Sequence, residues 1–169
     1  QAIRYMNRER EGTVGKMLIA LDESTTSMTA VKYAAEQFAT TKDLQITLVH
    51  VLPNLPAIFW DEGHILSDDE KKDRKKVVDK WLADRLVKME PLFRKATELL
   101  VAKGISAARI GRKTISDSLD AADSILEAAK DGGFGTIVLG RHSSGNGSRH
   151  LIGIVTNKVM SHAAGMTVI

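Results

Sequence analysis

The chain has 169 residues, enough for one domain with a sizeable hydrophobic core. Hydrophobic residues make up 43% of it and charged residues 27%, and no apolar run is long enough to cross a bilayer, so we expect a soluble globular protein. The absence of cysteine excludes a disulfide framework and a thiol nucleophile, and is compatible with the reducing cytoplasm, where we expect the protein. The net charge of +3 comes from interleaved basic and acidic residues, which argues against nucleic-acid binding.

Residues 1–15 are polar and do not resemble a signal peptide, so we expect a flexible leader followed by one domain over residues 16–169. The apolar block Met17–Leu21 predicts a buried strand. Behind it, Asp22–Ser24 offers helix-capping residues, and apolar residues at helical spacing predict a helix that ends near Phe38.

The next elements are a β-branched strand over Gln45–Leu52 and a loop over residues 54–67. A charged helix with one apolar face is then expected over Asp68–Lys103. Pro91 falls inside this helix, and we expect it to kink the helix or divide it in two. The basic run Lys71–Lys76 has acidic neighbours and is interpreted as a solvated helix face.

The last third of the chain repeats the alternation of strand and helix. A strand is expected over Ser106–Ile115 and a helix over Ser118–Lys130, capped by Ser116 or Asp117. A buried strand at Thr136–Leu139, a helix from about Gly153 to Ala163 and a strand at Met166–Ile169 complete the chain. The alternation predicts a single-domain α/β fold with an open, five-stranded, mostly parallel sheet and helices on both faces.

The segment that begins at Gly140 has the composition of a phosphate-binding loop. Glycines at 140, 145, 147 and 153 follow a buried strand and precede a helix, so backbone N–H groups and the positive end of the helix dipole can face an anion. The segment has neither the Gly-Lys-Ser/Thr of a P-loop nor the GxGxxG spacing of dinucleotide sites. An ordinary flexible strand-to-helix loop is the alternative interpretation.

Three predicted strands end at residues that suit a ligand site. Asp22, Val51 and Gly140 lie at the carboxyl ends of their strands, and parallel sheets bind ligands at these ends where the strand order reverses. The three ends can therefore converge on one crevice. Asp22 can contact a ribose or adenine there, or cap the helix that follows it, or do both with different oxygens.

From residue 16 to residue 169 the chain resembles the universal stress protein family, small α/β proteins related to the adenine nucleotide α-hydrolases. Nucleotide-binding members carry a glycine, two residues, a glycine, nine residues, a glycine and then Ser or Thr. In that register this chain has Gly140, Ser143, Gly153 and Ile154, so the second glycine and the final hydroxyl are both replaced.

The resemblance implies an adenine slot beside Asp22 and the backbone of Val51, with Ala20 near it. It implies that the phosphates meet Gly140, Arg141, Ser143, Gly153, Ile154, Val155 and Thr156. The expected ligand is ATP, with or without Mg²⁺, and the expected assembly is a homodimer that pairs through Met166–Ile169. The resemblance thus favours an ATP-binding regulatory protein of the stress response.

Two other functions stay open. Ser143 and Ile154 favour a family member that has lost nucleotide and acts as a dimeric interaction module. An adenylating enzyme is the weaker alternative, since the residues after Asp22 contain no glycine for a pyrophosphate-binding loop. We identify no catalytic residue and no metal-ligand spacing, and we expect any ATP hydrolysis to be slow and incidental. His50 is interpreted as a partly buried histidine with satisfied hydrogen bonds.

Overall fold

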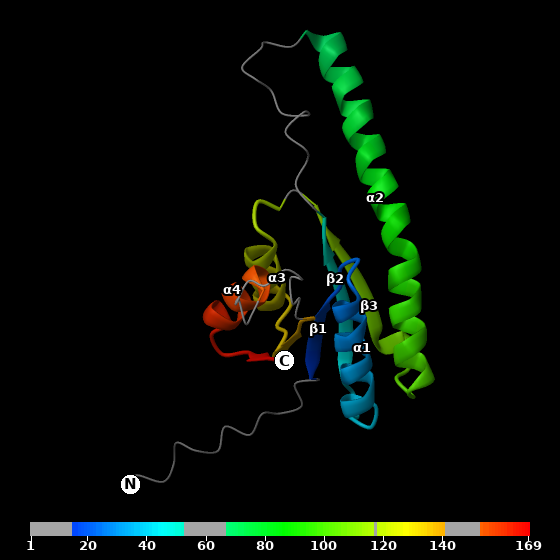
Figure 1. Ribbon diagram of the computed structural model, residues 1–169, viewed down its shortest axis with the longest axis vertical. Coiled ribbons are helices and arrows are strands. Elements are labelled where there is room, and N and C mark those ends of the chain that lie inside the picture. The colour runs from blue at the N-terminus through cyan, green and yellow to red at the C-terminus, as the bar shows by residue number, and fades with distance from the viewer. Residues whose placement is uncertain (1–14, 53–66, 117, 141–152) are drawn as a thin grey trace, which may run out of the picture.

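The computed structural model describes residues 15–52, 67–116, 118–140 and 153–169 (Figure 1). The predicted leader up to residue 14 and the predicted loop over 54–66 lie outside these residues. Five strands form one sheet in the order β3-β2-β1-β4-β5, and every neighbouring pair is parallel. They are β1 (Lys16–Ala20), β2 (Gln45–Val51), β3 (Ile110–Ile115), β4 (Thr136–Val138) and β5 (Thr167–Val168). The predicted α/β fold is confirmed.

The sheet is buried at its centre because its middle strands carry apolar residues on both faces. In β1, Met17 and Ile19 face one core and Leu18 faces the other, and all three are buried. β1 pairs with both β2 and β4, so the strand order reverses beside it. A continuous apolar run is the pattern expected of such a doubly covered strand.

Two helices cover each face of the sheet (Figure 1). α1 (Thr25–Phe38) and α2 (Asp68–Ala102) lie on one side and share a core with the sheet. α3 (Ala121–Asp131) and α4 (Ile154–His162) lie on the other side and share a second core. The sheet is therefore the middle of three layers.

Side chains close the N-termini of three of these four helices. Ser24 caps α1, Ser67 caps α2 in a capping box with Glu70, and Asp120 caps α3. The predicted α3 cap was wrong: Ser116 does not cap the helix, and Asp117 lies outside the described residues. Ser118, which was expected to begin the helix, instead shares a 2.7 Å hydrogen bond with the Ser124 hydroxyl.

α2 is one helix of 35 residues that continues through Pro91, so the predicted division in two was wrong. The buried residues Met89, Phe93 and Ala96 lie on both sides of the proline along one face, and their packing keeps the helix continuous. The N-terminal half of α2 extends beyond the sheet (Figure 1). There, exposed lysines pair with aspartates three or four residues away, as in the Lys75–Asp79 pair at 3.0 Å.

The remaining differences concern the ends of elements. The strand expected over Ser106–Ile115 begins at Ile110, because a 3-10 helix, η2 (Ala107–Arg109), precedes it. The final strand is shorter than the predicted Met166–Ile169, although Ile169 N–H still donates to the Ile137 carbonyl. Among the described residues, no helix has both the length and the apolar character that a membrane span needs.

Candidate functional site

A pocket of about 820 Å³ opens at the carboxyl ends of β1, β2 and β4, beside the point where the strand order reverses. This is the expected place for a ligand in an open parallel sheet, and the volume suits a small organic molecule. The wall on the sheet side consists of strand ends and the turn into α1, and the opposite wall comes from α3 and α4. Its described lining comprises Ala20, Leu21, Asp22, Ser27, Val49, His50, Val51, Ala121, Ile125, Leu139, Gly140, Gly153, Ile154, Val155, Thr156, Asn157, Lys158, Ser161 and His162.

The turn from β1 into α1 is built by a chain of hydrogen bonds. The Asp22 carboxylate accepts from the Ser24 N–H at 3.0 Å and also from the Ser24 hydroxyl. Ser24 in turn accepts from the Ser27 N–H and caps α1, and the Ser27 hydroxyl donates to the Asp22 carbonyl at 2.9 Å. Asp22 therefore holds the capping serine and is not itself the helix cap.

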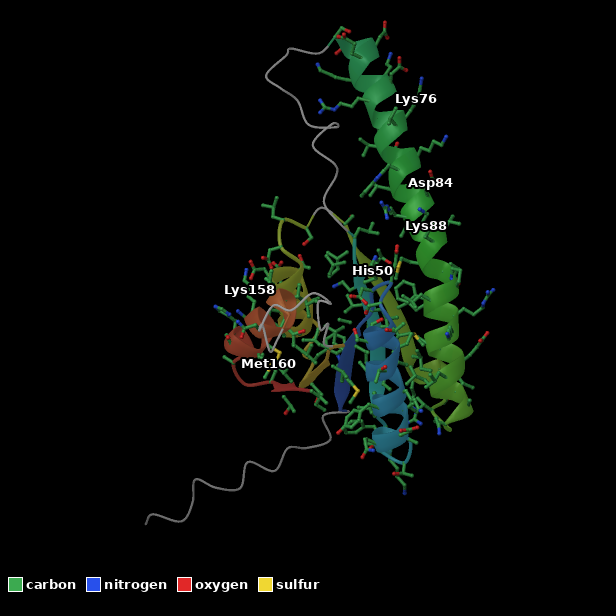
Figure 2. The ribbon with its side chains drawn as sticks, in the orientation of Figure 1. His50, Lys76, Asp84, Lys88, Lys158 and Met160 are labelled. Atoms are coloured by element: carbon green, nitrogen blue, oxygen red, sulfur yellow. The ribbon has the colours of Figure 1, made fainter. Side chains whose placement is uncertain are left out.

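His50 lies at the end of β2 and is buried (Figure 2). Its Nδ1 donates a 2.8 Å hydrogen bond to the Leu21 carbonyl, which can only accept. This bond joins the ends of β1 and β2 and fixes the tautomer with the proton on Nδ1. The predicted histidine with satisfied hydrogen bonds is confirmed, and it is more deeply buried than the partial burial that was expected.

The N-terminus of α4 differs from the other three because its cap is Gly153, which has no side chain to accept a hydrogen bond. The first bond within the helix runs from Asn157 N–H to the Gly153 carbonyl. The N–H groups of Ile154, Val155 and Thr156 therefore precede the helical ladder, and all three residues line the pocket. A helix start with free N–H groups and a positive dipole end favours an anionic ligand group.

Lys158 lines the pocket from α4 and joins that helix to α3 (Figure 2). Its Nζ lies 2.7 Å from Asp123 Oδ2 and 3.2 Å from Asp120 Oδ2. The hydrogen bond to Asp123 raises the pKa of Lys158 above its usual value. The Asp123 backbone N–H, followed by Lys158, lowers the pKa of Asp120. Lys158 and Asp120 are therefore both charged at neutral pH.

Eight of the residues proposed from sequence line this one pocket. They are Ala20, Asp22, Val51, Gly140, Gly153, Ile154, Val155 and Thr156. Arg141 and Ser143 lie outside the described residues. Within the described ranges no cluster of His, Asp or Glu could hold a metal ion.

Sequence reasoning missed the wall that α3 and the later residues of α4 contribute, which includes Ala121, Ile125 and Lys158. The predicted parallel sheet implies that the end of a further strand leads into α3, but no local pattern says that α3 begins beside β1 and β2. Ser27 was also missed, although a serine on the apolar face of a predicted helix marks a position that needs a nearby carbonyl.

The family model described as the universal stress protein family matches residues 13–169. Among solved structures, a universal stress protein from Burkholderia pseudomallei is 20% identical, with a TM-score of 0.61 over 94% of this chain and 96% of that one. A universal stress protein from Archaeoglobus fulgidus in complex with dAMP is 17% identical, with a TM-score of 0.58 over 92% and 95%.

A third structure is a universal stress protein family protein from Arabidopsis thaliana with AMP bound. It is 20% identical to this chain, with a TM-score of 0.52 over 92% of this chain and 89% of that one. No curated protein sequence matches significantly. These likenesses agree with the described fold, and the family model covers nearly the whole chain. The chain therefore belongs to the universal stress protein family.

Proposed function

We propose that this protein binds an adenine nucleotide, ATP in particular, in the pocket at the strand ends. The observation that carries the proposal is the N-terminus of α4, where the cap Gly153 has no side chain and the first backbone N–H groups lie at the same pocket as the ends of β1 and β2. The similar protein from Archaeoglobus fulgidus is in complex with dAMP, and the one from Arabidopsis thaliana has AMP bound. Both ligands combine a purine with a phosphate.

The phosphate end of the proposed site depends on backbone groups. Gly153 opens the helix without a side chain, and Gly140, which follows β4, belongs to the same pocket lining. Ile154 stands where nucleotide-binding members carry a hydroxyl, and the residue is 89% exposed. Losing one neutral hydrogen bond costs about 1 kcal/mol, or about fivefold in affinity, so the backbone donors are sufficient to keep phosphate binding.

The adenine end of the proposed site lies beside Ala20, Asp22 and Val51. Val49 and Ile125 add apolar surface to the same part of the lining. A planar base fits between such apolar side chains, while the backbone of Val51 and the Asp22 carboxylate offer polar groups to its edge. This arrangement supports the proposed preference for adenine.

The ionisable side chains of the described lining favour binding over catalysis, because each already has a partner. The Asp22 carboxylate accepts from Ser24, His50 donates to Leu21, and Lys158 is held by two aspartates. The His162 ring is hydrogen-bonded to the Lys158 carbonyl at 2.9 Å. We therefore propose a regulatory role in the stress response, in which bound nucleotide changes conformation or partner binding and hydrolysis is slow and incidental.

We also propose that the protein is a homodimer that pairs through β5. In the described sheet β5 is an edge strand, and neither Thr167 nor Val168 carries a charge that would prevent pairing. Pairing with a second copy across a two-fold axis would cover this edge in a closed interface.

Calorimetric titration of the full chain with ATP, AMP and GTP tests the proposed ligand. We expect micromolar-class affinity for ATP, weaker binding of GTP, and a thermal shift that follows the same order. Titrations with and without Mg²⁺ separate a metal-assisted mode from a metal-independent one. If millimolar ATP gives neither heat nor a thermal shift, the exposed Ile154 marks a member that has lost nucleotide, and the function is that of an interaction module.

A further inference from the structure

We propose that Lys158 is a positioning residue that fixes the phosphate-facing start of α4 against α3. This inference rests on the proposed function, because it concerns how the same pocket is shaped. The geometry points to it through one cation that joins two helices, both of which contribute their first residues to the pocket lining.

Little of α4 is buried. It is nine residues long, and Val159 is its only buried residue. Ile154 at its start is almost fully exposed, and Met160, labelled in Figure 2, is half exposed. One buried side chain near the middle of a short helix leaves the helix free to pivot, so a second contact is needed to fix the direction of its N-terminus.

Lys158 supplies that second contact one residue before Val159. Its ammonium group lies between the carboxylates of Asp120 and Asp123, at 3.2 Å and 2.7 Å. Asp120 has two functions, since its Oδ1 accepts from the Asp123 N–H as the cap of α3 while its Oδ2 faces Lys158. The same carboxylate thus caps the N-terminus of α3 and forms an ion pair with Lys158 of α4.

The clamp formed by Lys158, Asp120 and Asp123 sets the width of the pocket on this side. Ala121, next to the α3 cap, and the first residues of α4 line the same space. An anion held by backbone N–H groups is sensitive to their placement, because hydrogen bonds weaken steeply with distance and angle. The two ion pairs of Lys158 are exposed, so they contribute little to global stability. Their main effect is on the direction of α4.

Replacing Asp123 separates positioning from simple electrostatics. If Lys158 acted only as a positive charge near the phosphate, Asp123→Asn would remove a competing negative charge and strengthen AMP binding. A clamp predicts the opposite sign. We expect Lys158→Met and Asp123→Asn each to raise the AMP Kd by about two- to fivefold, the range of an exposed ion pair, while Lys158→Arg keeps wild-type affinity.

Matched controls come from an ion pair on α2. Lys75→Met and Asp79→Asn break a 3.0 Å exposed pair far along the chain from the pocket lining, and we expect both to leave the AMP Kd unchanged. Tighter or unchanged AMP binding by Asp123→Asn would overturn the proposal.

A second measurement works without nucleotide. Amide hydrogen exchange of the segment 153–162 is expected to be faster in Lys158→Met and Asp123→Asn than in wild type, and unchanged in Lys75→Met. Equal exchange rates in all variants would overturn the clamp even if AMP binds. If wild-type protein gives no heat with AMP, the proposed function fails, and the exchange comparison still decides for or against the clamp.

Discussion

Gly140 lies so close to Ser27 that a Cβ atom on the glycine would be 2.5 Å from the Ser27 backbone nitrogen. The same Cβ would be 2.5 Å from the carbonyl carbon of Thr26. The residues that follow β4 are thus in direct contact with the first turn of α1, and both Gly140 and Ser27 line the pocket. The glycine that opens the proposed phosphate loop therefore has a structural function as well.

We predict that Gly140→Ala destabilises the protein by about 1–3 kcal/mol, the usual range for overpacking, because backbone atoms of α1 must move to admit the methyl group. Urea unfolding monitored by circular dichroism measures the change. Gly135→Ala is the matched control, since a Cβ there has no atom within 4 Å, and we expect it to stay within about 0.5 kcal/mol of wild type. Equal stability of the two variants would show that β4 and α1 are not in this contact.

The Gly153 position is predicted to act on binding and not on folding. Its backbone has φ −63° and ψ 154°, which any residue adopts, so Gly153→Val should fold normally. The valine side chain would occupy the space where phosphate approaches the α4 N–H groups, and calorimetry should then detect no ATP binding.

Ile154→Ser is the companion variant, because it restores the hydroxyl of the family motif at the first residue of α4. We expect ATP to bind more tightly by about 1 kcal/mol if one neutral hydrogen bond is gained. A Gly153→Val protein that binds ATP as tightly as wild type would place the phosphate elsewhere.

The sequence predicts the strands and the strand-end residues well because both depend on local patterns. The run Met17–Ile19 is apolar on both faces, which identifies a central strand, and Asp22 follows it directly. The parallel fold then brings the ends of β1, β2 and β4 together, and eight proposed residues line one pocket. The adenine nucleotide remains a proposal, because the pocket lining is compatible with this ligand but does not require it.

The errors in prediction come from tertiary contacts. Pro91 did not divide α2, because Met89 and Phe93 pack into the same core on either side of it. Asp120 caps α3 in place of Ser116, and it is also held by Lys158 from a helix more than thirty residues later. Ser and Asp are about equally favoured as N-cap residues, so propensity alone does not choose between Ser116 and Asp120. The contact with Lys158 favours Asp120, and a short stretch of sequence around the helix start does not contain that partner.

The Lys158 clamp is predicted to give a characteristic pH dependence. The pKa of Asp120 is lowered in the folded protein. Asp120 therefore stabilises the fold at pH values above its unfolded-state pKa of about 3.9, and this stabilisation is lost as the pH falls through the folded-state pKa. The pKa of Lys158 is raised in the folded protein. Lys158 therefore stabilises the fold at pH values below its unfolded-state pKa of about 10.4, and this stabilisation is lost as the pH rises through the folded-state pKa.

The difference in melting temperature between wild type and Lys158→Met should therefore be constant from about pH 5 to pH 9 and shrink at both ends. Differential scanning fluorimetry from about pH 3 to about pH 11 measures it, because both unfolded-state pKa values then fall inside the range. Lys158→Arg serves as the control and should follow wild type at acidic and neutral pH. A difference that does not decrease below about pH 4 would show that the ion pair is not its source.

Pro91 is predicted to destabilise α2 although the helix continues through it. Proline has no N–H to donate to the Val87 carbonyl one turn earlier, and Val87 is exposed to water at that point. We expect Pro91→Ala to raise the unfolding free energy by about 1–3 kcal/mol, since the missing hydrogen bond is restored in a helix-favouring residue. Arg94→Ala, at an exposed position on the same helix, is the control and should have little effect. A Pro91→Ala protein no more stable than wild type would contradict this prediction and would mean that the packing of Met89 and Phe93 already offsets the missing hydrogen bond.

The proposed dimer can be tested at the open edge of β5 because its residues alternate between two directions. Thr167 and Ile169 donate their N–H groups to Gly135 and Ile137, so Val168 directs its N–H away from β4. Proline is tolerated at an edge where its missing N–H faces outward. We expect wild type to give twice the monomer mass of 18.5 kDa in light scattering, and Val168→Pro to give the monomer mass while its circular dichroism stays that of the folded chain.

Thr167→Pro is the control that removes a hydrogen bond to the segment of β4 and should lower stability. Deletion of residues 166–169 should cost both dimerisation and stability, since Met166 and Val168 pack on the second core. A wild-type chain that remains at 18.5 kDa throughout the micromolar range would overturn the dimer, and a Val168→Pro chain that keeps the dimer mass would place the interface away from β5.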